Sequence, residues 1–412
     1  MVKKGLNNFF ESFLKQDSLF LNKKAMQATF VPQEIEHRDD QINQIAEIVA
    51  PVLKLEKPSN LFIYGKTGTG KTLSVKYTAE NIRNVAKENN VPLKIIYINC
   101  KLKRVADTEY RLVAELARAT FGKEIPTTGL PTDQVYSIFY QALDNEEQLL
   151  VVILDEIDQL VKKTGDEVIY NLTRINSELK KSQISLIGIS NDMMFMNHID
   201  PRVKSSLSEE EIFFPAYNAL QIQDILKNRC KVAFKENVLN EGVIPKCSAY
   251  AAREHGDARR AIDLLRVAGE LAEREKSQQV LIKHIDAAEE KIEKDRIVDI
   301  VKTQPKQFQA TLMAILYKTL ELKTSNSKNT NKVMYTGDVY DIYKNICPKV
   351  DLRPISQRRL SDIIAELDML GLINAKVISK GRFGRTREIQ FAMPSHLLSK
   401  VESLLKNELN IK

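Results

Sequence analysis

The sequence predicts an α/β fold, a parallel sheet with helices on both faces, followed by a helical region and a small C-terminal module. Five apolar runs read as strands, and longer helical segments separate the first four of them, which is typical of a parallel sheet buried on both sides. The strand signal stops after Pro215. The runs lie at residues 61–64, 94–98, 149–154, 184–189 and 211–214.

The segments before the first run are expected to be helical or extended. Residues 1–30 alternate apolar and basic positions without a sustained period, which indicates a short helix and an extended lead. Asp39 to Leu55 has the spacing of an amphipathic helix, because Ile42, Ile45 and Val49 fall on one side.

The last third of the chain predicts helices and then a hairpin. Residues 218–300 read as helical throughout, and Pro305 marks a boundary. Three helices closed by a basic two-stranded hairpin describe a winged helix. Its predicted parts are helices at 307–321, 336–346 and 355–370, a polar loop at 324–332, and two strands within 374–391.

These patterns divide the 412 residues into parts, in keeping with the roughly two to four domains expected at this length. The predicted parts are a lead segment at 1–30, an α/β domain at 31–216, a helical domain at 217–303 and a winged helix at 304–412.

The composition, 43% hydrophobic and 28% charged, is that of a soluble globular protein. No apolar run approaches the ~20 residues that span a bilayer, and no signal-peptide pattern follows Met1. The four cysteines are far apart, so buried reduced thiols in a cytoplasmic protein are the expectation. We expect no membrane partner and a nucleoid-associated location in the cytoplasm.

The positive charge is concentrated at the C-terminal end. Residues 305–412 carry 18 Lys and Arg against 10 Asp and Glu, whereas the rest of the chain is close to neutral. A basic module on a near-neutral body predicts a polyanion as the partner of that module.

A phosphate-binding loop follows the first predicted strand. Residues 65–72 read Gly-Lys-Thr-Gly-Thr-Gly-Lys-Thr and lead into a helical segment. This is the Gly-x-x-x-x-Gly-Lys-Ser/Thr pattern in its strand–loop–helix context, in which backbone N–H groups and the helix N-terminus surround phosphates. Lys71 is expected to reach the β- and γ-phosphates, and the Thr72 hydroxyl to hold Mg²⁺. The alternative, a chance Gly/Thr-rich turn, does not explain the flanking strand and helix.

Two acids end the third predicted strand. Asp155 is expected to hold Mg²⁺ beside Thr72, and Glu156 to polarise the water that attacks the nucleotide. The alternative is an acidic helix N-terminus after a buried strand, since acids are favoured there.

Three further polar residues are candidates for the same site. Asn191 follows the fourth predicted strand and could bond the γ-phosphate, although Asn-Asp pairs also form turns. Arg202, after Asp200-Pro201, is placed to act on a nucleotide at a subunit interface, or is a surface arginine. Arg259 follows Gly256-Asp257 in the first turn of a helix and would report on the γ-phosphate if that helix packs over the loop, or is a surface arginine behind a cap.

Five segments stand in the order and spacing of the motifs of AAA+ ATPases. They are Gly65–Thr72, Val151–Asp158, Ile189–Asp192, Asp200–Leu207 and Gly256–Arg260. The chain most resembles the archaeal origin recognition complex/cell division control protein 6 family of replication initiators. The resemblance covers the chain from about residue 30, and it implies ATP or ADP with Mg²⁺, an AAA+ core, a helical lid and a C-terminal winged helix. Lys66-Thr67 departs from many relatives, but at variable positions of the loop.

The resemblance assigns roles residue by residue. Asn191 is the first sensor, Arg259 the second, and Arg202 the inter-subunit arginine. Val31-Pro32 and His37-Arg38-Asp39 resemble the segment that borders the adenine. The predicted nucleotide-binding residues are Val31, Arg38, Gly65, Lys66, Thr67, Gly68, Thr69, Gly70, Lys71, Thr72, Tyr217 and Arg259, with Thr72 and Asp155 as Mg²⁺ ligands.

The winged helix carries the predicted DNA-binding residues. Its third helix is expected to enter the major groove, and the hairpin to contact the backbone or the minor groove. The alternative is a protein-binding winged helix with a solvated charged hairpin. The predicted DNA-binding residues are Ser356, Gln357, Arg358, Arg359, Lys380, Arg382, Phe383, Gly384, Arg385 and Arg387.

The implied function is an ATPase of slow, Mg²⁺-dependent turnover that acts as a switch in DNA replication. It would bind double-stranded origin DNA and help to recruit or load the replicative helicase, with paralogous initiator subunits as further partners. Relatives also contact DNA between the second and third strands, where Lys101, Lys103, Arg104 and Lys123 are candidates. The alternatives are a winged-helix AAA+ transcriptional regulator that binds promoters and a signalling ATPase that does not read DNA.

Overall fold

A computed structural model gives the fold, and it divides the chain into two compact units, Met1–Asp286 and Ala287–Lys412, which are described separately. The structure describes residues 17–27, 30–32, 34–101, 106–122, 125–126, 129–207, 209–254, 256–324, 334–379, 385–393 and 397–411.

The first unit contains a parallel five-stranded sheet in the order β2-β3-β4-β1-β5. All five predicted strands are confirmed, each one or two residues longer than its apolar run at one or both ends. Their bounds are β1 Asn60–Gly65, β2 Leu93–Asn99, β3 Gln148–Asp155, β4 Ser182–Ser190 and β5 Glu209–Phe214.

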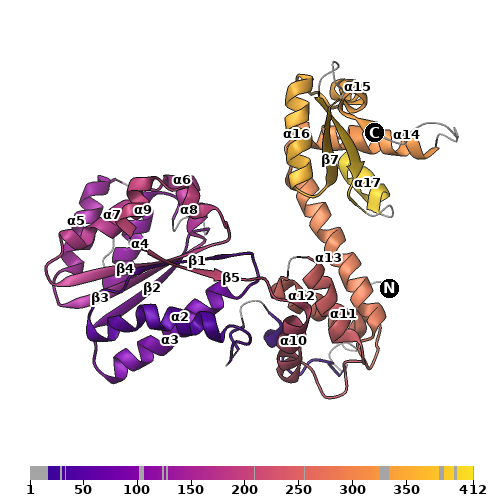
Figure 1. Ribbon diagram of the computed structural model, residues 1–412. Helices are drawn as coiled ribbons and strands as arrows, with labels where there is room; N and C mark the ends of the chain where they lie inside the picture. Colours follow the sequence, from indigo (N-terminus) through magenta and orange to yellow (C-terminus); the bar gives the residue numbers. More distant parts are fainter. Residues whose placement is uncertain are drawn as a thin grey trace, which may run out of the picture. The chain divides into compact units, whose positions relative to one another are not determined.

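Successive residues of the strands face opposite sides, so that each face of the sheet has its own core. Leu61 and Ile63 pack with α2 and α3, whereas Phe62 packs with α4 to α9. Figure 1 shows these two layers of helices on either side of the sheet. The helices are α2 Asp39–Val49, α3 Lys71–Glu88, α4 Glu109–Phe121, α5 Thr132–Leu143, α6 Ile157–Thr164, α7 Glu167–Arg174, α8 Phe195–His198 and α9 Pro201–Leu207.

The predicted helix from Asp39 to Leu55 is divided in the structure. The α-helix α2 ends at Val49, and a 3-10 helix, η2, continues over Ala50–Lys54. Pro51 has no N–H to donate within an α-helix, and Leu55 then takes a left-handed conformation with φ of 60°. A second short 3-10 helix, η3, follows α7 at Ile175–Ser177.

The helical part of the first unit gathers residues from both ends of its sequence. The ring of Phe20 packs against that of Phe234, with centroids 4.5 Å apart and the ring planes tilted by 30°. Leu21 N donates to Ala233 O at 2.9 Å, and Ser18 Oγ donates to Glu273 at 2.6 Å. The described part of the lead segment, which includes η1 (Lys23–Met26), therefore packs on the lid. The lid helices are α10 Ala219–Ala233, α11 Val243–Arg253 and α12 Ala258–Arg274, and α13 spans Ile282–Thr303.

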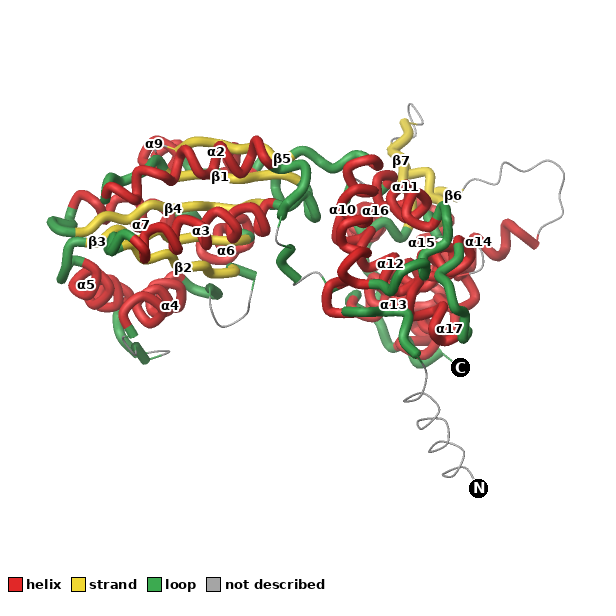
Figure 2. The backbone as a smooth tube through the Cα atoms, turned by 90° about the horizontal axis from the view of Figure 1, so that it is seen from below, coloured by secondary structure: helices red, strands yellow, loops and turns green. Residues whose placement is uncertain are grey.

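The second unit is a winged helix with a three-stranded sheet in the order β6-β8-β7. The backbone trace in Figure 2 shows its helices in red and its strands in yellow, with β6 and β7 labelled, and β7 pairs with β8 in antiparallel fashion. The sequence predicted the helices and the hairpin but neither β6, which has two residues, nor the last helix α17. The elements are α14 Lys306–Thr324, β6 Met334–Tyr335, α15 Thr336–Ile346, η4 Cys347–Val350, α16 Gln357–Met369, β7 Ile373–Ser379, β8 Arg385–Phe391 and α17 Leu398–Glu408.

All four cysteines are free and buried, as the sequence predicted. Burial raises the pKa of the Cys100 and Cys230 thiols to about 12, so both are neutral at ordinary pH. Among the helices of the described residues, none has the length and apolar character needed to cross a membrane.

Gly188 in β4 tests the packing of the sheet. A Cβ at this position would lie 2.7 Å from Cε1 of Phe62, in a core that cannot yield without moving the ring. We expect Gly188→Ala to lower the free energy of unfolding by about 1–3 kcal/mol. Urea denaturation followed by far-ultraviolet circular dichroism measures the loss.

The control is Gly337→Ala in α15, where the added Cβ has its nearest neighbour at 4.0 Å. Alanine is the better helix former, so the control should be neutral or more stable by about 0.5–1 kcal/mol. Equal losses in the two variants would contradict this account of the sheet.

Candidate nucleotide site

The parallel sheet brings the predicted site residues to one edge. β1, β3 and β4 are neighbours, and their carboxyl ends carry the phosphate loop, the two acids and Asn191. Asp155 is paired with Asn99 of β2 on one side and Ile189 of β4 on the other. Groups far apart in the sequence therefore meet because the strands run in one direction.

Left-handed backbone shapes the phosphate loop. Gly70, the N-cap of α3, has φ of 92°, and a Cβ there would lie 2.8 Å from the hydroxyl of Tyr217. Gly68 has φ of 71°, and a Cβ there would collide with the Asp257 carboxylate. Glycine is thus required by both conformation and space, and the loop is enclosed between Tyr217 and Asp257.

Lys71 lies at the centre of the loop and is 5% exposed. Its ammonium donates to Gly65 O and Lys66 O, each at 2.7 Å, and to Asn191 Oδ1 at 2.9 Å. Burial, with a smaller effect of Arg259, lowers the pKa of Lys71 to about 8, and Asp155 opposes the shift. In this arrangement all three ammonium protons are used within the protein.

Asp155 is held by three donors at the end of β3. Thr72 Oγ1 donates to its Oδ2 at 3.0 Å, Tyr97 OH donates to the same oxygen at 2.6 Å, and the Glu156 N–H donates to Oδ1. Burial and then the bond to Asp155 raise the pKa of Tyr97, which keeps its phenol protonated as a donor. A hydroxyl and a carboxylate side by side offer the oxygen ligands that Mg²⁺ takes, so Thr72 and Asp155 fit such an ion.

Glu156 has a strained backbone for a residue that is not glycine, with φ of 55°. Such strain is characteristic of functional sites. The Lys101 ammonium lies 3.7 Å from its Oε2, and the Glu156 side chain remains 22% exposed. The carboxylate therefore lies at the edge of the site, where it can meet a water molecule.

Arg259 comes to the site from the lid. Asp257 caps α12 by accepting from the N–H groups of Arg259 and Arg260, and the Ala258 N–H donates to Gly68 O at 3.3 Å. The first turn of α12 therefore contacts the phosphate loop directly. Because of this contact, Arg259 lies close enough to Lys71 to lower its pKa.

These groups line a cavity of about 910 Å³. Its polar lining includes Lys71, Thr72, Asp155 and Glu156 with Asn191 and Arg259. Its apolar lining comes mainly from the lead segment and the lid, namely Phe30, Val31, Pro32, Ile35, Ile225, Val232 and Ile262. Convergent polar groups together with apolar walls suit a nucleoside triphosphate, whose phosphates need the former and whose base needs the latter.

Arg38 supports the loop from behind and does not line this cavity. It is 2% exposed, and it donates to Thr69 O at 2.8 Å and to Pro215 O at 2.6 Å. Its guanidinium lies 3.8 Å from the centre of the Tyr217 ring. Arg38 thus holds the loop in place, whereas Tyr217, against which it packs, also lines the cavity. Contact of these two residues with the nucleotide stays a prediction.

The other predicted site residues lie outside the cavity. Arg202 is 88% exposed and pairs with Asp200. Gly65, Lys66 and Thr67 belong to the loop but do not line the cavity.

Tyr97, Phe30 and Arg229 were not predicted for the site. Arg229 and Phe30 both line the cavity. The Arg229 guanidinium lies 4.8 Å from the centre of the Phe30 ring and donates to the carbonyls of Ala25 and Phe30. Their positions follow from the packing of the lead segment on the lid, for which the sequence has no local signal. Tyr97 lies on a predicted strand, but only its register beside β3 brings it to Asp155.

In the winged helix, α16 begins at Gln357, two residues later than predicted, because Ser356 caps it by accepting from the Arg359 N–H. Gln357, Arg358 and Arg359 are exposed at its N-terminal end, whereas Leu360 is buried. Arg387 of β8 donates to Ser361 Oγ of α16 at 3.3 Å. Lys380, Arg382, Phe383, Gly384 and the Arg385 side chain lie outside the described residues, as do Lys103, Arg104 and Lys123.

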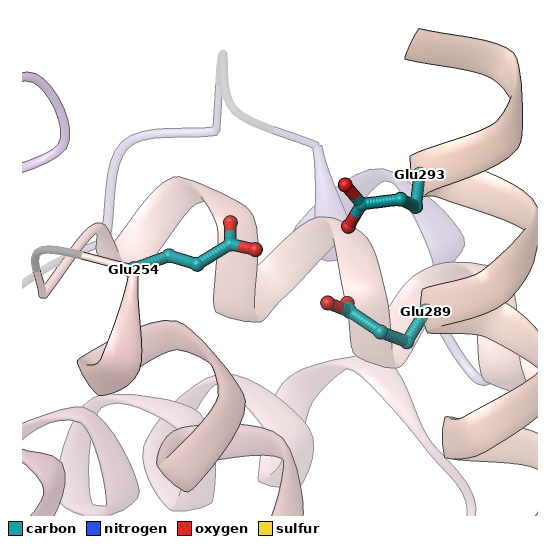
Figure 3. A group of neighbouring side chains, drawn as sticks. All are labelled: Glu254, Glu289 and Glu293. Carbon is teal, nitrogen blue, oxygen red and sulfur yellow. The ribbon is translucent and has the colours of Figure 1, made fainter. Parts of the chain in front are cut away.

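Figure 3 shows three glutamates that do not line the cavity, Glu254 at the end of α11 and Glu289 and Glu293 on α13. Glu254 belongs to the first unit and the other two to the second. Acidic side chains of this kind are common without a metal ion, and we assign none to them.

Family descriptions match the chain in three places. The AAA domain matches residues 55–192, the Cdc6 AAA+ ATPase-type lid domain residues 223–290, and the CDC6 C-terminal winged helix domain residues 299–401.

Relatives match along nearly the whole chain. An ORC1-type DNA replication protein of Pyrococcus furiosus is 48% identical over 410 residues, 99% of this chain and 94% of the relative. The ORC1-type DNA replication protein 1 of Methanosarcina mazei is 49% identical over 97% of this chain and 94% of the relative. The structure of the Aeropyrum pernix ORC1 protein in complex with DNA is similar with a TM-score of 0.80 and 39% identity, covering 95% of this chain and 98% of that one.

Arg38→Lys tests the support of the phosphate loop. Lysine cannot reproduce the fork of donors to Thr69 and Pro215, so the buried Thr69 carbonyl and the partly buried Pro215 carbonyl cannot both keep their partner. We expect a loss of about 2–4 kcal/mol in the free energy of unfolding and weaker nucleotide binding. Thermal unfolding and titration with a fluorescent nucleotide measure the two effects. Arg202→Lys, on an exposed side chain, should change stability by less than about 0.5 kcal/mol. A tolerated Arg38→Lys would show that the loop does not depend on this residue.

Proposed function

The chain belongs to the ORC1-type/Cdc6 family of archaeal DNA replication proteins, and on this premise we propose that it is an ATP-regulated initiator. It binds double-stranded origin DNA and helps to recruit or load the replicative helicase. The observation that carries the proposal is the meeting of Lys71, Asp155, Glu156 and Asn191 with Arg259 of the lid around one cavity. A nucleotide in this cavity touches both the core and the lid.

In this proposal ATP binds with its phosphates at the loop. Lys71 exchanges the carbonyls of Gly65 and Lys66 for β- and γ-phosphate oxygens, and the N–H groups at the start of α3 donate to the same phosphates. Thr72 and Asp155 would hold Mg²⁺, which would neutralise phosphate charge when bound. The apolar lining of the cavity, which includes Val31, holds the base.

Glu156 then orients and polarises the attacking water, and Asn191 holds its amide toward the γ-phosphate. Hydrolysis is slow and serves as a switch, because the product ADP no longer offers a γ-phosphate to Arg259. Since α12 contacts Gly68 directly, a change at the γ-phosphate shifts the balance of lid positions. Arg202, exposed on the surface, acts on a nucleotide held by a neighbouring paralogous subunit.

The winged helix holds the DNA in this proposal. The exposed residues at the start of α16 enter the major groove, and the hairpin around Arg382 and Arg385 contacts the backbone or the minor groove. Two facts support this assignment, namely the excess of positive charge in residues 305–412 and the DNA complex of the similar Aeropyrum pernix protein. The basic residues after β2, among them Lys101, form a second contact.

A transcriptional regulator that binds promoters is the second candidate, because the same site and the same winged helix would serve it. Mapping the occupancy of the protein along its chromosome separates the two functions. An initiator occupies the replication start sites and recruits the helicase there. Binding confined to promoters would overturn the proposal.

Lys71→Ala tests whether nucleotide binding and DNA binding are separate. Loss of the charged donors should weaken ATP binding by about 100-fold, whereas the winged helix should bind duplex DNA within about twofold of the original protein. Nucleotide titration and a DNA mobility-shift assay measure the two affinities. Lys87→Ala, at the exposed far end of α3, is the control for loss of a charge. Equal loss of both activities in Lys71→Ala would contradict this division.

Replacing both Arg382 and Arg385 with Ala tests the hairpin. We expect weaker DNA binding and a salt dependence lowered by roughly one to two ion equivalents. Fluorescence anisotropy of a labelled duplex at several salt concentrations gives the slope. The control replaces Lys400 and Lys406 of α17, which removes the same charge elsewhere in the domain. An unchanged slope in the arginine variant would exclude the hairpin from the DNA contact.

A further inference from the structure

Asp158 is a buried carboxylate that the proposed chemistry does not use. It lies in the first turn of α6 and is 3% exposed. Taking a charged carboxylate out of water is costly unless partners surround it, and an apolar residue of similar size often serves stability as well or better. Stability alone is therefore a weak reason for an acid at this position.

The partners of Asp158 lie on its own helix and at the end of β4. Gln159 Nε2 donates to its Oδ2 at 2.7 Å, and the Lys162 ammonium lies 3.6 Å from the same oxygen. Ser190 Oγ, on the last residue of β4, lies 3.3 Å from its Oδ1. Ser190 is itself 2% exposed, so this contact is inside the protein.

Ser190 in turn fixes the turn that contains Asn191. Its Oγ accepts from the Asp192 N–H at 2.9 Å, which closes the backbone around Asn191. Lys162 lies 4.0 Å from Asp192 and so joins α6 to the same turn from the outside. Asn191 Oδ1 then accepts from the Lys71 ammonium. A continuous set of polar contacts thus runs from α6 through the end of β4 to the phosphate loop.

We propose that Asp158 and Ser190 are positioning residues that hold the Asn191 amide at the place where the γ-phosphate is read. Asp158 at 3.3 Å and the Asp192 carbonyl at 3.2 Å are the two acceptors for the Ser190 hydroxyl, and together they hold this side chain in the turn. Ser190 then fixes the turn that presents Asn191 to Lys71 and the nucleotide. A shift of about 1 Å in a positioned group can reduce turnover about 100-fold. The inference rests on the proposed ATPase function and assigns these two residues to the same site.

The first test is Ser190→Ala, which removes the link and leaves Asn191, Lys71 and both acids in place. We expect kcat for ATP to fall about tenfold to 100-fold while KM stays within about threefold. Ser190→Thr keeps the hydroxyl and should recover most of the activity. Asp158→Ala should cause a loss similar to that of Ser190→Ala, and the double variant should be no worse than either, because both act through one link.

Ser185→Ala is the matched control. Ser185 lies five residues earlier on β4 and is as buried as Ser190, at 1% exposed, but its hydroxyl meets Ser59 O away from the site. It should leave kcat unchanged. Urea denaturation of all variants identifies those that fail to fold, and Ser190→Ala is decisive because it removes a single oxygen.

A second readout needs no turnover. This readout is the ratio of the binding affinities for ATP and ADP. If Asn191 reads the γ-phosphate from a fixed turn, Ser190→Ala should lower this ratio to the value found for Asn191→Ala. Adding Ser190→Ala to the Asn191→Ala variant should then change the ratio no further. Loss of kcat in Ser185→Ala as well, or full activity of Ser190→Ala, would overturn the inference. A wild-type protein that neither hydrolyses ATP nor distinguishes it from ADP would instead contradict the proposed function itself.

Discussion

The parallel direction of β1, β3 and β4 is the constraint on which the site depends. Each strand ends in a different polar group, and parallel pairing places all these groups at one edge of the sheet. Asp155 faces Ile189 across the β3–β4 pair, two residues before Asn191, and Tyr64 faces Ser190 across the β1–β4 pair. A shift of one residue in either pairing would turn alternate side chains to the opposite face. The packing of apolar side chains on the two faces of the sheet fixes this register. The same packing therefore determines how the site residues are placed.

The phosphate loop is also held from both sides by residues that are not part of its pattern. Arg38 and Tyr217 support it from behind, and Asp257 with the start of α12 closes it from the lid. The loop is therefore already shaped, and the carbonyls of Gly65 and Lys66 accept from the same Lys71 ammonium that would donate to phosphate oxygens. A ligand that replaces those bonds meets donors that are already in position, so its binding costs little conformational entropy of the loop. Because the lid contacts the same loop, a change at the bound phosphates also affects the position of the lid.

The sequence predicted much of this arrangement because strong local patterns carry it. Continuous apolar runs predicted the strands, and the glycines at 65, 68 and 70 with Lys71 predicted the loop. Asp155, Glu156, Asn191 and Arg259 could be named because each follows a strand or opens a helix. Tyr97 could not, because its contact with Asp155 depends on strand register rather than on neighbouring residues. Arg38 could be found but not its buried position behind the loop, since burial depends on Tyr217, far along the chain. The two residues of β6 are too short to leave a periodic signal.

The packing of Phe20 against Phe234 has a consequence for the order in which the protein is made. Ser18 and its partner Glu273 are 255 residues apart in sequence. At a synthesis rate of about 5–20 residues per second, roughly 13–50 seconds pass on the ribosome before the partner exists. Until then the Phe20 ring lacks the complete lid that covers it. Its close contact at Gly269, where Phe20 Cζ would lie 2.6 Å from an added Cβ, also cannot form before that residue is synthesised. The sheet domain can form during this interval, but the lid can be completed only after its last helices leave the ribosome, so the earliest residues of the described chain are among the last to find their places.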